Sequence, residues 1–431
     1  LGCGSWGGNS VSGNLGVKHL MNIKTIAMRQ ENMLWFKVPP KVYFKAGCLP
    51  HALRELKGRK KAFIITDKPL FDLGYTRPIT DVLEEVGISF QIFSDVHPDP
   101  DLSTIHQALD LVNAFQPDVI IALGGGSPID AAKIVWLMYE HPELKFEDMA
   151  MRFMDIRKRI FEFPEMGQKA YMVAVPTTSG TGSEVTNISV AIVKDEKDGK
   201  LTGGDTKLGL VSDDIIPNKV CLVPDLLKTL PYKPFAASAI DALIHATESF
   251  LSPHRKTVTS EMFSVKAMEM ILEGFRRIAL EGPDARMDYL GEFVHASLFA
   301  GIAFLKAGCA TVHGMSFPLG GTYHVPHGES NYALFGKILE MYDEYEPAGE
   351  LGKFKEIVAR CLGCTKEDAL RTLNVTLEKV LHLKPLHEYG FKEEDVKAFA
   401  LSVDANQQRL ITNSYRPWSI ELSERVYKEC F

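Results

Sequence analysis

The chain has 431 residues, and 45% of them are apolar, which is enough to bury a large core. Chains of this length usually divide into more than one domain, so we expect two. The formal net charge of −7 excludes a surface built for nucleic acid, because such surfaces depend on clustered Lys and Arg.

The sequence also indicates where in the cell the protein works and what kind of partner it binds. No apolar run reaches the roughly 18 residues that a membrane span requires, and no charged segment precedes an apolar one at the start. The seven cysteines have no regular spacing, which is typical of a reducing compartment. We interpret Cys361 and Cys364, in CLGC, as two ordinary cysteines near a helix end. We therefore expect a cytoplasmic protein with a small-molecule partner and neither a membrane nor a nucleic-acid partner.

Residues 1–34 are predicted to be a linker or junction. They begin with LGCGSWGGNSVSG, which is rich in Gly and Ser. The chain starts with Leu1 rather than Met, so we expect it to be a piece of a longer protein.

Residues 35–225 are predicted to form an α/β domain. From about Lys61, short β-rich runs alternate with amphipathic stretches, in KAFIITD, DVLEEVG, SFQIFSDV, LSTIHQALDLVNAF and DVIIALGGGS. Such alternation predicts βαβ units and a parallel sheet. The runs YMVAVP, ISVAIV and VCLV continue the strand pattern to about residue 223, and the Asp-, Gly- and Lys-rich stretch 195–218 is expected to form loops.

Residues 226–431 are predicted to form an all-α domain. After Pro231 the sequence has apolar residues three and four apart almost to its end, for example in SEMFSVKAMEMILEGFRRI and KEDALRTLNVTLEKVL.

The segment GGGSPIDAAKIVWL is a candidate phosphate-binding turn. It follows the strand pattern DVIIAL and opens a helix, where glycines let the backbone approach a pyrophosphate. Its candidate contacts are Gly125, Gly126 and Ser127. Ile129 replaces the third glycine of the usual dinucleotide motif, and a tight turn without a ligand is the alternative.

Asp67 is a candidate for the adenosine ribose. It ends the strand pattern KAFIITD, at the carboxyl edge where open α/β sheets bind ligands. A carboxylate there can accept from both ribose hydroxyls and repels the 2′-phosphate of NADP, so NAD is preferred. The alternative is an Asp that only caps a helix.

A hydroxyl-rich segment, PTTSGTGSEVTN, follows a buried strand pattern and offers donors to phosphates or to the nicotinamide amide. A plain polar loop is the alternative. The candidate cofactor contacts in this segment are Thr177, Thr178, Thr181 and Ser183. Two residues outside it, Asp130 and Lys207, are further candidates.

Four residues are candidate metal ligands. Asp241 and His245 lie four apart in SAIDALIHATESF, and therefore on one face of a predicted helix. His313 and His327 would be about 21 Å apart on an unbroken helix, which is too far for one ion. The stretch between them contains helix-breaking residues that let the chain turn, namely Pro318, Gly320, Gly321 and Pro326.

Three imidazoles and one carboxylate suit Fe(II) or Zn(II) and leave room for a substrate oxygen. Such an ion polarises an aldehyde carbonyl or lowers the pKa of an alcohol, as hydride transfer requires. Each histidine taken singly is more often a packed core residue than a ligand.

Together these motifs resemble the iron-containing (group III) alcohol dehydrogenases, through GGGSPIDAAK, PTTSGTGSEVTN, SAIDALIHATESFLSP and HGMSFPLGGTYHVPHG. The resemblance covers roughly residues 35–431. It implies a nucleotide-binding domain related to dehydroquinate synthase, a helical domain, and a homo-oligomeric NAD(H)-dependent alcohol dehydrogenase that reduces short-chain aldehydes. It also implies the ligands Asp241, His245, His313 and His327 and a ribose contact by Asp67.

Two branches of the family compete for the substrate. The first 44 residues look like the junction before the alcohol dehydrogenase half of the bifunctional aldehyde-alcohol dehydrogenases, which implies an upstream CoA-acylating aldehyde dehydrogenase domain. KPLHEYGFKEEDV and GGTYHVPHGESNYALF are more similar to 4-hydroxybutyrate dehydrogenases, which reduce succinic semialdehyde. That substrate calls for a basic contact, with Lys207, Arg255 and Lys306 as candidates.

Two alternatives lie outside these branches. One is a non-catalytic nucleotide-binding assembly module. The other, the metal-dependent cyclase branch of the same fold, is disfavoured because its phosphate-rich substrate would need Lys and Arg near the ligands.

One residue departs from the family pattern. Many relatives have a histidine where this chain has Phe317, near the nicotinamide. If that histidine relays protons, this chain needs another route, through His324, Tyr323, or the cofactor ribose and water. The phenylalanine could equally narrow the pocket around a short aldehyde.

Overall fold

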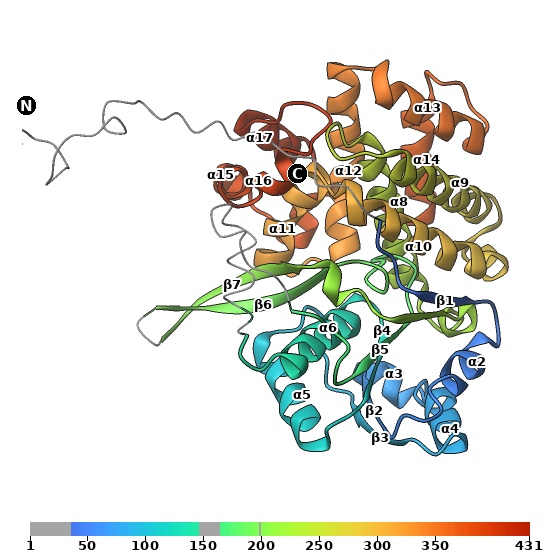
Figure 1. Ribbon diagram of the computed structural model, residues 1–431. Coiled ribbons are helices and arrows are strands. Elements are labelled where there is room, and N and C mark those ends of the chain that lie inside the picture. Colours follow the sequence, from blue (N-terminus) through green and yellow to red (C-terminus); the bar gives the residue numbers. More distant parts are fainter. Residues whose placement is uncertain (1–35, 145, 147–163, 198–199) are drawn as a thin grey trace, which may run out of the picture. The chain divides into compact units, whose positions relative to one another are not determined.

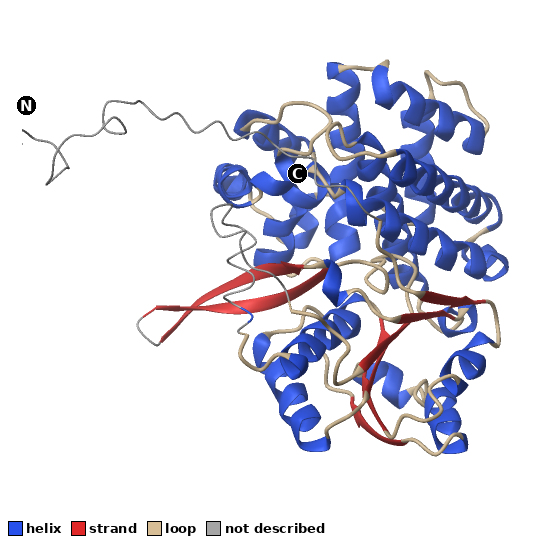
Figure 2. Cartoon of the chain, viewed as in Figure 1, coloured by secondary structure: helices blue, strands red, loops and turns tan. Residues whose placement is uncertain are grey.

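The computed structural model describes residues 36–144, 146, 164–197 and 200–431, so the predicted junction at 1–34 lies outside the described residues. Within the described chain, strands and helices alternate as far as residue 176, further strands follow to residue 222, and from residue 232 the chain is helical (Figures 1 and 2). This confirms the predicted fold class of an α/β region followed by an all-α region.

Six parallel strands form one sheet in the order β1-β8-β5-β4-β2-β3. They are β1 (Lys41–Phe44), β2 (Lys61–Ile65), β3 (Ser89–Phe93), β4 (Val119–Gly124), β5 (Tyr171–Pro176) and β8 (Lys219–Leu222). The strand pattern was expected to begin near Lys61, so β1 is an addition. It lies at the sheet edge and pairs with β8, with Lys41 opposite Lys219.

Alternate residues of the strands enter two apolar cores on opposite faces of the sheet. Phe63 and Ile65 of β2 pack in one core, and Ala62 and Ile64 pack in the other. The helices α5 and α6 cover the first face, and α2 and α4 cover the second (Figure 1). The helices of this region are α2 (Cys48–Arg54), α3 (Lys68–Asp72), α4 (Arg77–Glu85), α5 (Leu102–Phe115) and α6 (Gly126–Glu140).

A separate antiparallel hairpin replaces most of the predicted loop at 195–218. Strands β6 (Ile188–Lys197) and β7 (Lys200–Val211) pair from Ile188 opposite Val211 to Lys197 opposite Lys200. The loop prediction is therefore wrong. Pairing with β6 satisfies the backbone groups of β7, and so a strand forms despite the unfavourable Gly and Asp.

The helical region contains ten α-helices among the described residues. They are α8 (Tyr232–Leu251), α9 (Val258–Glu281), α10 (Leu290–Ala307), α11 (Thr311–Tyr323), α12 (His327–Tyr345), α13 (Gly349–Leu362), α14 (Ala369–Val380), α15 (Val396–Asn406), α16 (Gln408–Ile411) and α17 (Ile420–Glu429). The stretch Pro283–Ala307 is long and apolar enough to cross a membrane, but 72% of its window is buried, as in the core helix of a globular protein.

The two regions share one core. Val220 and Leu222 of β8 belong to the same apolar cluster as the buried residues of α8 and α10. Residues Lys37–Phe431 accordingly form one compact unit. The predicted boundary at 225/226 falls between β8 and α8, and we retain it as a proposal.

Candidate metal centre and nucleotide loop

Helix α8 carries the first two ligand-type side chains. Asp241 and His245 lie one turn apart on this helix and are only 2% and 4% exposed. A carboxylate and an imidazole buried among apolar residues are costly unless other groups satisfy them. The groups that contact Asp241 and His245 therefore indicate the role of these two side chains.

The other two histidines lie at the starts of neighbouring helices. His313 is in the first turn of α11, and His327 is the first residue of α12. The chain reverses between the helices, where His324 has a left-handed backbone with φ of 52°. This short turn brings the two histidines together.

The turn is smaller than the sequence suggested. A break at Pro318, Gly320 or Gly321 was expected, but α11 continues through all three to Tyr323. A proline inside a helix removes one hydrogen bond, and the burial of most of α11 outweighs that loss. Of the expected helix breakers, only Pro326 lies between the two helices.

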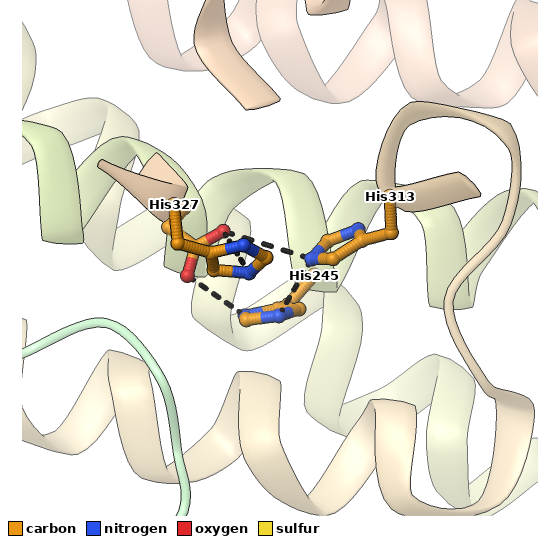
Figure 3. A group of neighbouring side chains, drawn as sticks. His245, His313 and His327 are labelled. Carbon is orange, nitrogen blue, oxygen red and sulfur yellow. Dashed lines mark hydrogen bonds and ion pairs between the residues drawn. The ribbon is translucent and has the colours of Figure 1, made fainter. Parts of the chain in front are cut away.

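Four side chains meet at this point and form what we call the ligand cluster. Its members are Asp241, His245, His313 and His327, and one ligand atom from each lies within 4.8 Å of the others. Figure 3 shows the three imidazole rings turned toward a common point. Nε2 of His245 and Nε2 of His313 lie 2.9 Å apart.

Hydrogen bonds on the outer side fix two of the imidazole rings. Nδ1 of His245 lies 3.3 Å from the carbonyl oxygen of Gly180, and the ring stacks on Phe304. Nδ1 of His313 lies 2.6 Å from a carboxylate oxygen of Glu248. Because these outer partners are acceptors, each Nδ1 carries the proton and each Nε2 is directed into the cluster.

The charges of the cluster also suit a cation. Burial lowers the pKa of His245 to about 3, so this imidazole is neutral. Burial raises the pKa of the Asp241 carboxyl, but the neighbouring imidazoles, where protonated, and the hydrogen bond from Asn331 bring it below the ordinary value. Two Nε2 lone pairs at 2.9 Å repel each other unless a proton or a metal ion lies between them. Burial opposes the charge of His313, but Cys309 and Glu248 raise the pKa of this imidazole well above its ordinary value, so either a proton on His313 or a metal ion supplies the positive charge that these two atoms need.

The distances fit a transition metal. A tetrahedral ion with bonds of about 2.1 Å separates its ligand atoms by about 3.4 Å. Oδ1 of Asp241 lies 3.6 Å from Nε2 of His313 and 3.8 Å from Nε2 of His327. These two distances are slightly longer than the tetrahedral separation, and the 2.9 Å between the Nε2 atoms of His245 and His313 is slightly shorter. Three nitrogens and one oxygen are the donor set expected for Fe(II) or Zn(II).

The glycine-rich segment forms the turn from β4 into α6. Gly124 has φ of 152°, and a Cβ atom there would lie 2.5 Å from the ring of Pro128. Helix α6 starts at Gly126 with Gly125 as its N-cap, so the free N–H groups of its first turn face this bend. The backbone of Thr177 joins the turn by donating to the Gly124 carbonyl at 3.0 Å.

The hydroxyl-rich segment packs directly on this turn. A Cβ atom on Gly125 would lie 3.2 Å from Cγ2 of Thr178, and one on Gly126 would lie 3.0 Å from Cγ2 of Thr181. The two predicted cofactor segments are therefore side by side, and the glycines make this approach possible.

The same segment reaches the ligand cluster. Besides the contact of its Gly180 carbonyl with His245, a Cβ atom on Gly180 would lie 2.5 Å from the carbonyl oxygen of Ser238 on α8. Gly182 has φ of 59°, and its Cβ would lie 2.7 Å from the backbone of Gly301 on α10. The segment thus fits tightly between the nucleotide turn and the helices that carry the ligands.

Several predicted cofactor contacts have partners within the protein. The hydroxyl of Ser183 donates to Asp130, whose other carboxylate oxygen accepts from the backbone N–H of Val190 at 3.1 Å. The hydroxyl of Ser127 accepts from the backbone N–H of Asp99 at 3.2 Å. Ser183 and Asp130 therefore hold α6 against the hairpin, whatever their role toward a cofactor.

Asp67 lies at the carboxyl end of β2, as expected. It is the N-cap of α3, and its Oδ1 accepts from the backbone N–H of Leu70 at 2.9 Å. Partial burial raises the pKa of the carboxyl. The capping role that the sequence left open is therefore present, and the contact with a ribose stays a prediction.

The three basic residues considered for a substrate carboxylate differ in their surroundings. Lys306 forms an ion pair with Asp213 at 3.2 Å. The guanidinium of Arg255 lies beside Gly308, 3.2 Å from where its Cβ would be. Lys207 lies in β7, and its side chain is outside the described part of the structure. The ion pair leaves Lys306 less suited to this role.

The candidate proton carriers lie near the end of α11. The ring of Phe317 stacks 6.4 Å from that of His327 and provides an apolar wall beside the cluster. The hydroxyl of Tyr323 donates to Asp395, and His324 is exposed. Neither residue contacts the ligand cluster through a hydrogen bond or ion pair found among the described residues.

Two residues of the site were not anticipated. Glu248 lies on α8, three residues after His245 and seven after Asp241, so its helical spacing could have identified it. Asn331 lies one turn after His327 on α12, and its amide nitrogen is 2.8 Å from Oδ1 of Asp241. No motif in the sequence indicated it.

Two family models match the chain. Residues 39–224 match the model described as iron-containing alcohol dehydrogenase, and residues 235–431 match the C-terminal model of the Fe-containing alcohol dehydrogenase family. Among solved structures, a 1,3-propanediol oxidoreductase has 26% identity and a TM-score of 0.79, and the match covers 93% of this chain and 100% of that one.

Curated relatives include a bifunctional enzyme and a hydroxy-acid dehydrogenase. The chain is 46% identical to the bifunctional aldehyde-alcohol dehydrogenase AdhE of Escherichia coli K12 over 79% of its length, and it spans only 37% of that protein. It is 38% identical to the 4-hydroxybutyrate dehydrogenase of Clostridium kluyveri, over 93% of this chain and 100% of that protein.

The contacts of Glu248 predict a loss of metal affinity in Glu248→Gln. Its carboxylate accepts from His313 and from the backbone N–H groups of Ala310 and Val312. A glutamine amide offers only one oxygen and turns a donor toward one of these N–H groups. We expect the affinity for Fe(II) or Zn(II) to fall roughly 10- to 100-fold.

Equilibrium dialysis against buffered free metal measures this change. Thr247→Val is the matched control, because the buried Thr247 hydroxyl donates to the carbonyl of Leu243, with the sulfur of Met268 at 3.8 Å, and not to a ligand side chain. Equal affinities of Glu248→Gln and the parent would contradict the orienting role.

Proposed function

The chain belongs to the iron-containing alcohol dehydrogenase family and is an oxidoreductase that acts on alcohols and their carbonyl products, and we propose that it is an NAD(H)- and metal-dependent reductase of short-chain aldehydes. The observation that carries this proposal is the convergence of two imidazole Nε2 atoms at 2.9 Å beside a buried carboxylate. That arrangement calls for a cation at the place where a carbonyl oxygen would be polarised.

The proposed metal ligands are the four residues of the ligand cluster. When bound, Fe(II) or Zn(II) supplies Lewis acidity that stabilises negative charge on the substrate oxygen. Gly180 and Glu248 keep the His245 and His313 rings in the orientation and protonation state that binding requires. Asp241, His245 and His313 are buried, whereas the His327 side chain is 38% exposed, so the cluster is accessible on the His327 side.

The proposed cofactor site begins at the first turn of α6. Gly125, Gly126 and Ser127 lie where free N–H groups favour a pyrophosphate. Thr178 and Thr181 pack on this turn, in the segment whose Gly180 carbonyl contacts His245. A cofactor that binds along this segment would place its nicotinamide near the metal, as hydride transfer requires.

For the substrate, we favour a simple short aldehyde. Phe317 places an apolar ring beside His327, and Lys306 is paired with Asp213. The second candidate, succinic semialdehyde, is supported by the match with 4-hydroxybutyrate dehydrogenase along that enzyme's full length. We also propose a homo-oligomer and, from the match with AdhE, an upstream aldehyde dehydrogenase domain in the full-length protein.

The central test is NADH oxidation by protein stripped of metal and reloaded with Fe(II) or Zn(II). We expect reloading to restore activity, with a higher kcat/KM for acetaldehyde and butyraldehyde than for succinic semialdehyde. His313→Ala should lose both bound metal and activity. The control is His295→Ala on α10, whose imidazole bonds to the carbonyl of Gly291.

Three other results of this experiment would change or contradict the proposal. A preference for succinic semialdehyde would transfer the protein to the hydroxy-acid branch. Activity in His313→Ala protein that has lost its metal would contradict the metal-dependent mechanism. Failure of every reloaded sample to oxidise NADH with any of the three aldehydes would contradict the proposed function.

A second prediction concerns the choice between NAD and NADP. Asp67→Asn keeps a cap for α3 but removes the charge that would repel a 2′-phosphate. We expect the ratio of kcat/KM for NADPH to that for NADH to rise about 10-fold, which corresponds to about 1.4 kcal/mol. Asp72→Asn on the same helix removes an equal charge and should leave the ratio unchanged. An unchanged ratio in Asp67→Asn would limit Asp67 to capping.

A further inference from the structure

Asn331 is fully buried and lies among the metal-ligand atoms. Its amide nitrogen is 2.8 Å from Oδ1 of Asp241, 3.1 Å from Nε2 of His313 and 3.2 Å from Nε2 of His327. It therefore touches three of the four members of the ligand cluster, and it reaches them from α12, one turn after His327.

The direction of the strongest contact follows from chemistry. An ionised carboxylate oxygen can only accept a hydrogen bond, so the Asn331 amide donates to Asp241. A neutral donor at this place holds the carboxylate without competing for it, whereas a Lys or Arg would bring a positive charge that repels a metal ion.

The opposite side of the amide indicates that stability alone does not explain this residue. The Asn331 carbonyl oxygen is buried and has no hydrogen-bond partner within the described chain. An unsatisfied buried polar atom lowers stability, and a leucine of similar size would avoid that cost. Eight other buried side-chain atoms of the described chain also lack a partner, so the contacts with the ligand atoms are what distinguish Asn331.

We propose that Asn331 is a positioning residue of the metal centre, which holds Oδ1 of Asp241 and thereby fixes how this carboxylate meets the ion. Carboxylates that bind metals are usually held by such hydrogen bonds, which set their orientation. Asn331 thus does for Asp241 what Glu248 does for His313. This inference rests on the proposed function, because it takes the ligand cluster to be the metal site.

The test compares Co(II) binding in the parent and in two Asn331 variants of the same chain. Asn331→Leu removes the donor with little change of volume. Asn331→Asp keeps the shape but replaces the donor with an acceptor beside Asp241. The matched control is Ser330→Ala, because the buried Ser330 hydroxyl donates to the backbone carbonyl of His327 and not to a ligand side chain.

Two readouts separate positioning from a general loss of structure. We expect Asn331→Leu to bind Co(II) roughly 10- to 100-fold more weakly and with an altered visible d–d spectrum. Asn331→Asp adds a negative charge, which alone would tighten binding, so its altered spectrum is the sign of a turned Asp241. The control should match the parent in affinity and spectrum.

The outcomes distinguish the inference from its premise. Parent-like affinity and spectrum in Asn331→Leu, or a parent-like spectrum in Asn331→Asp, would overturn the role of Asn331 and leave the metal centre in place. A parent protein that binds no Co(II) would overturn both the proposed metal centre and this inference.

Discussion

The Nε2 atoms of two buried imidazoles face each other in this protein, and a proton or a metal ion between them relieves the repulsion of their lone pairs. The Nε2 atoms of His245 and His313 lie 2.9 Å apart beside the carboxylate of Asp241. The surrounding structure keeps them there, through the Gly180 carbonyl, the Glu248 carboxylate and a tightly packed helical core. The cluster is therefore held in place by partners within the protein, as the proposed metal site requires.

One short segment links this cluster to the nucleotide turn. Residues 177–183 follow β5, pack on the glycines that open α6, and present the Gly180 carbonyl to His245. The close approaches at Gly180 and Gly182 leave no room for side chains. The sheet and the helices therefore position the two halves of the proposed chemistry through a single rigid connection, within a core that both regions share.

The sequence predicted most of this arrangement where a periodic pattern was strong. The strands β2 to β5, the helices α5 and α6, and the placement of Asp241 and His245 on one helix face all follow from local patterns. The end of β6 and the strand β7 were missed because pairing between the two strands stabilises them. Asn331 was missed for a related reason, since its role depends on α8 and α12 lying together. The sequence could place Asp67 but could not decide its role. Helix capping and ribose binding both call for an Asp at this position.

The most direct test of the account is an anomalous difference map from crystals loaded with Fe(II) or Co(II), with data collected at the absorption edge of the metal. The account predicts one strong peak within about 2.3 Å of ligand atoms from Asp241, His245, His313 and His327. A loaded crystal with no peak among these four residues, or with its strongest peak elsewhere, would contradict the claim that this buried cluster is the metal centre.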